Sequence, residues 1–168
     1  MDLKKVNKSI AFCVIFYLFC LISCDSNKLF DAYQSQHEDG WRADESVQFE
    51  VQVSDTLNHY HVFLNLRTDH EFPYRNLFVL SQFSSPKGFV LKDTLEYEMA
   101  DAYGRWLGEG FTEVKHNKLF FLENYQFTHS GTYTFEFTQA MRKRGNIEGD
   151  QVLRGVLDVG LRIEKVEE

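Results

Sequence analysis

Cysteine and net positive charge are both scarce in this 168-residue chain, and each shortage excludes a class of protein. The three cysteines lie at positions 13, 20 and 24, so the remainder of the chain holds no disulfide framework and no cysteine-based metal site. Only 18 Lys and Arg residues stand against 25 Asp and Glu residues, which gives a formal net charge of −7. Nucleic-acid binding through phosphate contacts is therefore not expected.

The chain also lacks a hydrophobic run long enough to remain in a membrane. The uncharged run from Ile10 to Ile22 has 13 residues. As a helix it would span about 20 Å, which is short of the roughly 30 Å hydrocarbon core of a bilayer. Lys4, Lys5 and Lys8 precede it, and a basic start followed by a short apolar run is typical of a cleaved signal peptide.

The residues that follow the apolar run resemble a bacterial lipobox. Leu21 is the branched residue, Ser23 is the small residue, and Cys24 follows. In lipoproteins with this motif the cysteine thiol takes a diacylglyceryl group, the preceding peptide bond is cut and the new amine is acylated. The resemblance predicts a signal peptide over residues 1–23 and lipidation of Cys24, and two or three acyl chains anchor a protein stably. The alternative is an ordinary secretory signal followed by a coincidental cysteine.

The remainder of the chain divides into a polar segment and a domain. Residues 24–44 are polar with scattered aromatics such as Trp41, and we interpret them as the lipidated N-terminus and a tether. Residues 45–168 then form one domain, within which no repeat or further boundary is visible. A domain of this length buries about two-thirds of its unfolded surface, enough to fold without disulfides or metal.

Hydrophobic residues alternate with polar ones through most of the domain, which is typical of half-buried antiparallel strands. Residues 47–53 alternate without a break, and Phe49, Phe135 and Leu161 are predicted to face inward while Thr134 faces solvent. Further strands are expected over residues 60–67, 77–83, 89–91, 94–99, 118–122, 132–138 and 152–166, with turn residues between them. The pattern predicts an all-β fold, an antiparallel β-sandwich of the Ig-like or jelly-roll kind.

The sequence offers few candidates for a catalytic site, because it has no nucleophile-elbow, Walker, Rossmann or zinc-protease motif. His59 and His61 could share a strand face and bind a metal only if a loop supplied His70 or a nearby carboxylate, and we favour the alternative that they are exposed strand-edge histidines. Glu96 and Glu98 also share a strand face, where carboxylates are usually solvated rather than catalytic. We therefore expect no catalytic residues, no metal site and no cofactor.

The glycine-rich segment 102–111 contains the most informative residues of the domain. Trp106 follows Arg105 and is framed by Gly104, Gly108 and Gly110, and loops usually avoid tryptophan unless it packs or binds. One interpretation is a structural plug that closes the end of the sandwich. The other is a protein-contact surface formed by Arg105, Trp106 and Glu109, since Trp and Arg often dominate interfaces.

Several segments together resemble the GldH family of gliding-motility lipoproteins. They are residues 24–26, 93–100, 104–110, 131–135, 139–142 and 156–165, and they follow the family's order over nearly the whole chain. The resemblance implies a non-enzymatic envelope lipoprotein without a cofactor, required for gliding and acting with other lipoproteins and the linked type IX secretion machinery. Only Cys24 matches an assigned functional position.

Two hypotheses for function are compatible with the sequence. The first is an assembly subunit of the gliding and secretion apparatus whose partners are other envelope proteins. The second is a lipid-anchored carbohydrate-binding module in which Trp106, Trp41 and loop tyrosines stack on sugars. For both we expect the domain in the periplasm, held by the lipid on Cys24, with the outer membrane favoured over the inner.

Overall fold

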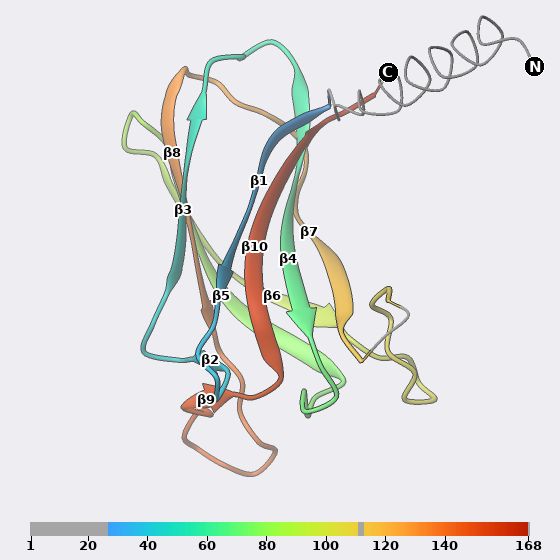
Figure 1. Cartoon of the computed structure of the whole chain (residues 1–168). Coiled ribbons are helices and arrows are strands. Elements are labelled where there is room, and N and C mark those ends of the chain that lie inside the picture. The colour runs from blue at the N-terminus through green and yellow to red at the C-terminus, as the bar shows by residue number, and fades with distance from the viewer. Residues whose placement is uncertain (1–26, 111–112, 168) are drawn as a thin grey trace, which may run out of the picture.

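The structure, a computed structural model, describes residues 27–110 and 113–167, and these form ten strands and no helix. The predicted all-β class is confirmed, because two four-stranded antiparallel sheets pack face to face as a sandwich (Figure 1). In the part of the chain that the structure describes, no helix could span a membrane. The predicted signal peptide of residues 1–23 and Cys24 lie outside the described residues.

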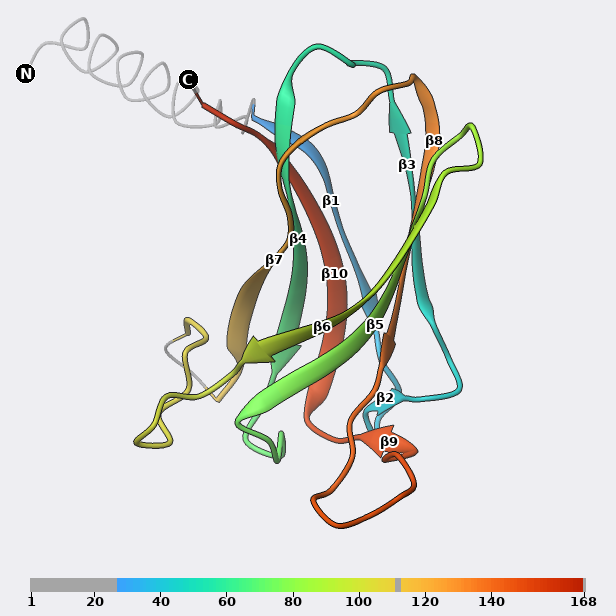
Figure 2. The same cartoon turned by 180° about the vertical axis from the view of Figure 1, so that it is seen from behind.

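Each sheet combines strands that are distant in sequence. The first sheet has the order β1 (Lys28–Ser35), β10 (Val156–Lys165), β4 (His59–Thr68) and β7 (Lys115–Gln126). The second has the order β3 (Val47–Val53), β8 (Gly131–Gln139), β5 (Asn76–Ser84) and β6 (Val90–Glu98). Two short strands, β2 (Trp41–Arg42) and β9 (Val152–Leu153), pair at one end of the sandwich (Figure 2).

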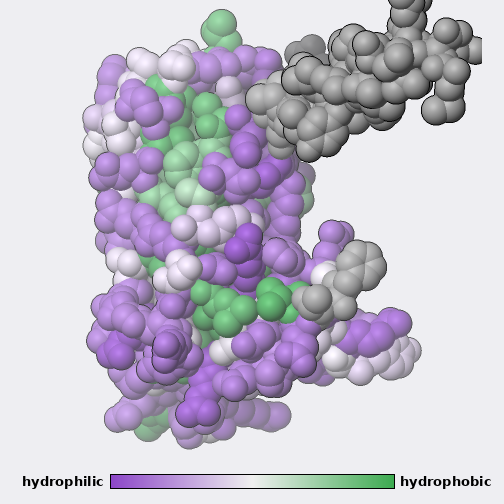
Figure 3. Space-filling model, in the orientation of Figure 1, coloured by the Kyte–Doolittle hydropathy of each residue, from purple (hydrophilic) through white to green (hydrophobic). Residues whose placement is uncertain are grey.

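The core lies between the sheets and follows the alternation of the sequence. Strand β3 alternates buried and exposed side chains without exception. From Tyr133 onward, β8 alternates buried and half-buried side chains. Phe49, Phe135 and Leu161 are buried while Thr134 is half-buried, so the predicted inward faces are confirmed. On the side that shows β1 and β3, hydrophobic surface follows the seam between these strands while their surroundings are polar (Figure 3).

The predicted tether is wrong for residues 28–44, because these residues belong to the sandwich. Strand β1 pairs antiparallel with β10 from Lys28 to Ser35 and forms an edge of the first sheet. The Phe30 ring packs edge-on against Phe49 at 6.3 Å between ring centroids. Trp41 is fully buried in the core. The folded domain therefore begins at about residue 28 rather than at residue 45.

Two further strands are longer than the sequence suggests. The segments 89–91 and 94–99 form the single strand β6, and residues 118–122 are only the middle of the twelve-residue β7. Both lie at sheet edges, where partial exposure on both faces weakens the alternation that marks a strand. The same reason explains why β1 was not predicted.

Candidate functional site

The loop of residues 101–110, which connects β6 to β7, is organised by the carboxylate of Asp101. This carboxylate accepts hydrogen bonds from the backbone N–H groups of Tyr103 and Arg105, both at 2.9 Å, and from Nε of Arg105 at 2.7 Å. The hydrogen bond from the backbone of Arg105 is the main cause that holds the pKa of Asp101 below its usual value. Gly104, at φ +82°, allows the chain to turn back so tightly that its N–H reaches the Asp101 carbonyl.

Trp106 is neither a buried plug nor a free side chain. Its ring packs edge-on against the buried Phe72 at 5.9 Å, and 39% of the residue remains exposed. Trp106 also pairs with Ala100 as an isolated bridge, and the N–H of Leu107 donates to the carbonyl of Met99. The structure therefore anchors one edge of the indole and leaves the other in solvent, which combines the two interpretations of the sequence.

The loop exposes a group of side chains that suits protein contact. Tyr103 is 87% exposed and Leu107 is 54% exposed. The guanidinium of Arg105 lies 5.7 Å from the centroid of the Tyr103 ring, so the salt bridge with Asp101 holds it beside an aromatic surface. Tyr, Trp and Arg are the residue types that most often dominate interfaces. Because hydrogen bonds already order the loop, a partner would bind it at little entropic cost.

Glu109, the third predicted contact residue, lies in a different environment from Arg105 and Trp106. Its backbone exchanges two hydrogen bonds with His116 at the start of β7, which attaches the end of the loop to the first sheet. There Glu109 lines a groove of about 550 Å³ on the outer face of that sheet. Other lining residues include Tyr33, Asn65, Leu107, Lys118 and Arg162.

The base of this groove is built on a close contact between Tyr33 and Gly160. A Cβ at position 160 would come within 2.6 Å of the Tyr33 ring, so the glycine lets the ring lie against the sheet. The buried Asn65 donates from Nδ2 to the Tyr33 hydroxyl at 3.1 Å, and the Arg67 guanidinium lies 4.4 Å from the ring centroid. This cluster was not predicted from the sequence, because Tyr33 lies in the segment interpreted as a tether. The polar residues at alternate positions of β4 were the available signal.

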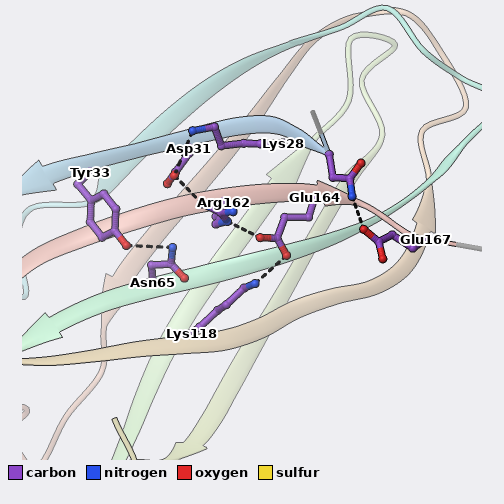
Figure 4. Close-up of polar contacts among 9 residues, drawn as sticks. Lys28, Asp31, Tyr33, Asn65, Lys118, Arg162, Glu164 and Glu167 are labelled. Carbon is purple, nitrogen blue, oxygen red and sulfur yellow. Dashed lines mark hydrogen bonds and ion pairs between the residues drawn. The ribbon is translucent and has the colours of Figure 1, made fainter. Parts of the chain in front are cut away.

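A charged network extends across the same sheet face (Figure 4). Arg162 on β10 donates to Asp31 on β1 at 2.8 Å and also to Glu164, and Lys118 on β7 donates to Glu164 at 2.7 Å. Partial burial opposes ionisation of Glu164, but the hydrogen bonds from Lys118 and Arg162 outweigh it and lower the pKa of this carboxyl. The network joins three strands of the sheet and fixes their outward side chains.

The histidines that could have formed a metal site lie apart. His61 accepts a hydrogen bond at Nδ1 from the backbone N–H of Asn124 and packs against Phe120. His70 lies two residues beyond the other end of β4, a strand about 30 Å long at the usual rise per residue, and beside Glu113. Within residues 27–110 and 113–167, no group of three or more His, Cys, Asp or Glu residues is placed to hold a metal ion.

The structure also assigns positions to the Glu96–Glu98 pair and to Trp41. Glu96 accepts a hydrogen bond from Asn76 on the neighbouring strand at 3.1 Å, and both Glu96 and Glu98 are exposed on the edge strand β6. The buried Trp41 offers no face to a sugar, so the carbohydrate hypothesis loses one of its two tryptophans.

Comparison with known proteins gives concordant results. A family model described as GldH lipoprotein matches residues 28–163. The "Gliding motility lipoprotein GldH homolog" of Christiangramia forsetii is 44% identical over 158 residues, covering 92% of this chain and 96% of that protein. The "Gliding motility lipoprotein GldH" of Flavobacterium johnsoniae is 41% identical over 145 residues, covering 86% of this chain and 89% of its own.

Solved structures give only a distant similarity. The VP2 protein of infectious bursal disease virus aligns with 85% of this chain and 33% of its own, at 13% identity and a TM-score of 0.35. A match at that level carries no argument about function, whereas the curated relatives are similar along nearly their entire lengths. The chain belongs to the GldH lipoprotein family.

Proposed function

We propose that this protein is a lipid-anchored, non-enzymatic component of the gliding-motility apparatus and its linked type IX secretion machinery. The lipid on Cys24 holds it in the cell envelope with the domain in the periplasm, on the outer membrane rather than the inner. The loop of residues 101–110 then binds another envelope protein of the apparatus. Family membership supports the assignment to gliding motility, since both curated relatives carry that description.

The observation that carries the contact function is the ordered exposure of this loop. Asp101 and Gly104 hold Arg105 beside the Tyr103 ring, while Phe72 holds Trp106 by one edge. An exposed Tyr, Trp and Arg in a loop that is already ordered are what a protein interface uses as its central contacts. Carbohydrate binding, the second hypothesis, retains Trp106 but lacks Trp41, which is buried in the core.

Substituting Tyr103 tests the contact without disturbing the fold. Tyr103→Ser should reduce crosslinking of the tagged, lipidated protein to its envelope partner on the order of 30-fold, as expected for loss of a central aromatic worth about 2 kcal/mol. Its melting temperature should stay unchanged because the side chain is 87% exposed. Colony spreading of the gliding host should fall in parallel.

Ile147→Ser is the matched control, because Ile147 is a similarly exposed apolar residue in another loop. This variant should crosslink and spread as the parent does. Trp106→Ala is a weaker test, since loss of its contact with Phe72 also costs stability. If Tyr103→Ser remains folded and crosslinks normally, the loop is not the contact surface.

The anchor is tested separately. Cys24→Ala should leave the domain folded but release it into the soluble fraction, because the acyl chains hold it in the membrane. Fractionation after a high-salt wash, followed by metabolic labelling with a fatty acid, measures both the release and the loss of lipid. A Cys24→Ala protein that still sediments with membranes would show that another element holds it there.

A further inference from the structure

One end of the sandwich gathers the start of β1 with several loops. The strand registers place the start of β1, the end of β3, the start of β4, the end of β5 and the start of β8 together at this end. The N–H of Lys165 donates to the carbonyl of Asn27, and that of Val166 donates to the carbonyl of His59. The views in Figures 1 and 2 agree that the two ends of the domain and these loops share one end. We call it the N-terminal end.

Only residues 25–27 separate Cys24 from β1. An extended chain advances at most about 3.6 Å per residue, so four steps reach no more than roughly 14 Å. By contrast, the ten residues of β4 span about 30 Å at the rise of a strand. The sandwich is thus longer than its linker, and a lipid on Cys24 keeps the N-terminal end close to the bilayer while the opposite end points away.

Two turns at the N-terminal end each present one apolar side chain to solvent. Leu57 is 82% exposed at the tip of the turn between β3 and β4. The carboxylate of Asp55 orders this turn by accepting hydrogen bonds from the backbone N–H groups of Leu57 and Asn58 at 2.8 and 3.2 Å. A hydrogen bond from the Tyr60 hydroxyl also reaches Asp55, so the acid nearest to Leu57 is engaged within the protein. Hydrophobic surface protrudes there in Figure 3.

The turn between β5 and β6 is ordered in a similar way. Phe89 is 58% exposed and is followed by the exposed Val90. The backbone N–H of Phe89 donates to the Ser85 hydroxyl at 3.0 Å, the N–H of Ser85 donates back to the Phe89 carbonyl, and Gly88 supplies a positive φ. The hydrogen bonds in both turns involve only backbone groups and polar side chains. They therefore do not explain why the apolar side chains of Leu57 and Phe89 are exposed to solvent.

Three lysines lie near these turns. Lys28 and Lys165 lie at the ends of the domain and Lys87 lies in the β5–β6 turn. The opposite end also carries cations, Arg142, Lys143 and Arg144, near the exposed Ile147, so the short linker from Cys24 and not the charge selects the end that faces the membrane. Leu and Phe on an apolar face, flanked by Lys, are the side chains that proteins place at the headgroup boundary.

We propose that the N-terminal end of the sandwich rests on the bilayer that holds the lipid of Cys24, with Leu57 and Phe89 inserted among the headgroups. The inference depends on the proposed lipidation of Cys24. The contact fixes the orientation of the domain, and it turns the end that carries the β2–β9 pair and residues 140–151 away from the membrane (Figure 1). The acyl chains supply the affinity, and the two turns prevent the domain from swinging on its linker.

Single-cysteine labelling tests this orientation on the full lipidated protein. The lipid blocks Cys24, and no other cysteine follows it, so Leu57→Cys, Phe89→Cys and Ile147→Cys each carry one reactive thiol. Each variant is labelled with an environment-sensitive fluorophore and reconstituted into vesicles of phosphatidylethanolamine and phosphatidylglycerol. Ile147 is the matched control, because it is apolar, 93% exposed and located in the loop at the opposite end.

The probes at positions 57 and 89 should shift their emission to the blue and be quenched severalfold more by headgroup spin-labelled lipid than the probe at position 147. Flotation of the vesicles separates the two hypotheses. Protein that does not float lacks the anchor, which removes the proposed lipidation and this inference together. Protein that floats while all three probes report water, or are quenched equally, retains its anchor but overturns the orientation.

Discussion

The hydrophobic core contains aromatic residues whose inward orientation can be tested one at a time. Phe135 is fully buried on β8, and its ring contacts Phe83 at 4.9 Å and Phe121 at 6.2 Å between centroids. These partners come from β5 and β7, so Phe135 joins the two sheets. Thr134 is adjacent in sequence but points to the other face of β8 and is only half-buried.

Phe135→Ala should lower the free energy of unfolding by about 3–5 kcal/mol, because truncation removes buried surface and leaves a cavity. That is a large share of the roughly 5–15 kcal/mol that stabilises a typical domain. Thr134→Ala, the neighbouring control, should change it by less than about 1 kcal/mol. Urea denaturation measures both, and equal losses at the two positions would contradict the assigned strand faces.

At the scale of the elements, β1 is the part of the fold that differs most from the sequence-based interpretation. It pairs with β10 alone and covers the edge of the first sheet, and its Leu29, Phe30 and Ala32 side chains pack against the core. Tyr33 on the same strand contributes to the groove on the outer face. The segment that leads from the proposed anchor is therefore also a structural strand.

A soluble chain that begins at residue 36 should melt about 10 °C or more below one that begins at residue 27. Loss of the packed Phe30 and of a strand's hydrogen bonds costs several kcal/mol, and a domain of this size shifts by roughly 4 °C per kcal/mol. The bared edge of β10 should also promote aggregation. Scanning calorimetry and light scattering measure the two effects, and matching melting curves would instead support a tether.

At the scale of the whole molecule, several carboxylates are held in their ionised form by the fold. Hydrogen bonds from Asn58, the Leu57 backbone and Tyr60 lower the pKa of Asp55 well below its usual value. The pKa values of Asp101 and Glu164 are lowered as well. A carboxyl whose pKa is lower in the folded state stabilises the protein above its unfolded pKa, and that stabilisation is lost as the pH falls through the folded pKa.

The free energy of unfolding should therefore fall as the pH drops from about 6 to about 3. Asp55→Asn should be less stable than the parent at about pH 6, and the difference should shrink towards about pH 3, where the parent carboxyl begins to lose its advantage. Glu148→Gln, in an exposed loop, controls for removal of one negative charge. A difference between the parent and Asp55→Asn that is constant with pH would show that ionisation of Asp55 does not contribute.

The sequence alone determined the all-β class, the N-terminal segment that resembles a lipoprotein signal and the inward faces of the central strands. Residues 47–53 and 132–138 could be assigned because one buried and one solvated face impose a period of two on the residues themselves. The loop with Arg105 and Trp106 was identified for a similarly local reason, since glycines frame an aromatic residue that loops usually avoid.

Only the tertiary structure decided what depends on pairing between distant segments. β1 became recognisable through its register with β10, since Asp31 and Arg162 are 131 positions apart, and the groove exists because Gly160 lies beneath Tyr33. The partial burial of Trp106 likewise depends on Phe72, which arrives from the loop after β4. Local periodicity shows which face of a strand is apolar. Packing over the whole chain determines which strands become neighbours, and this pairing leaves no periodic pattern in the sequence.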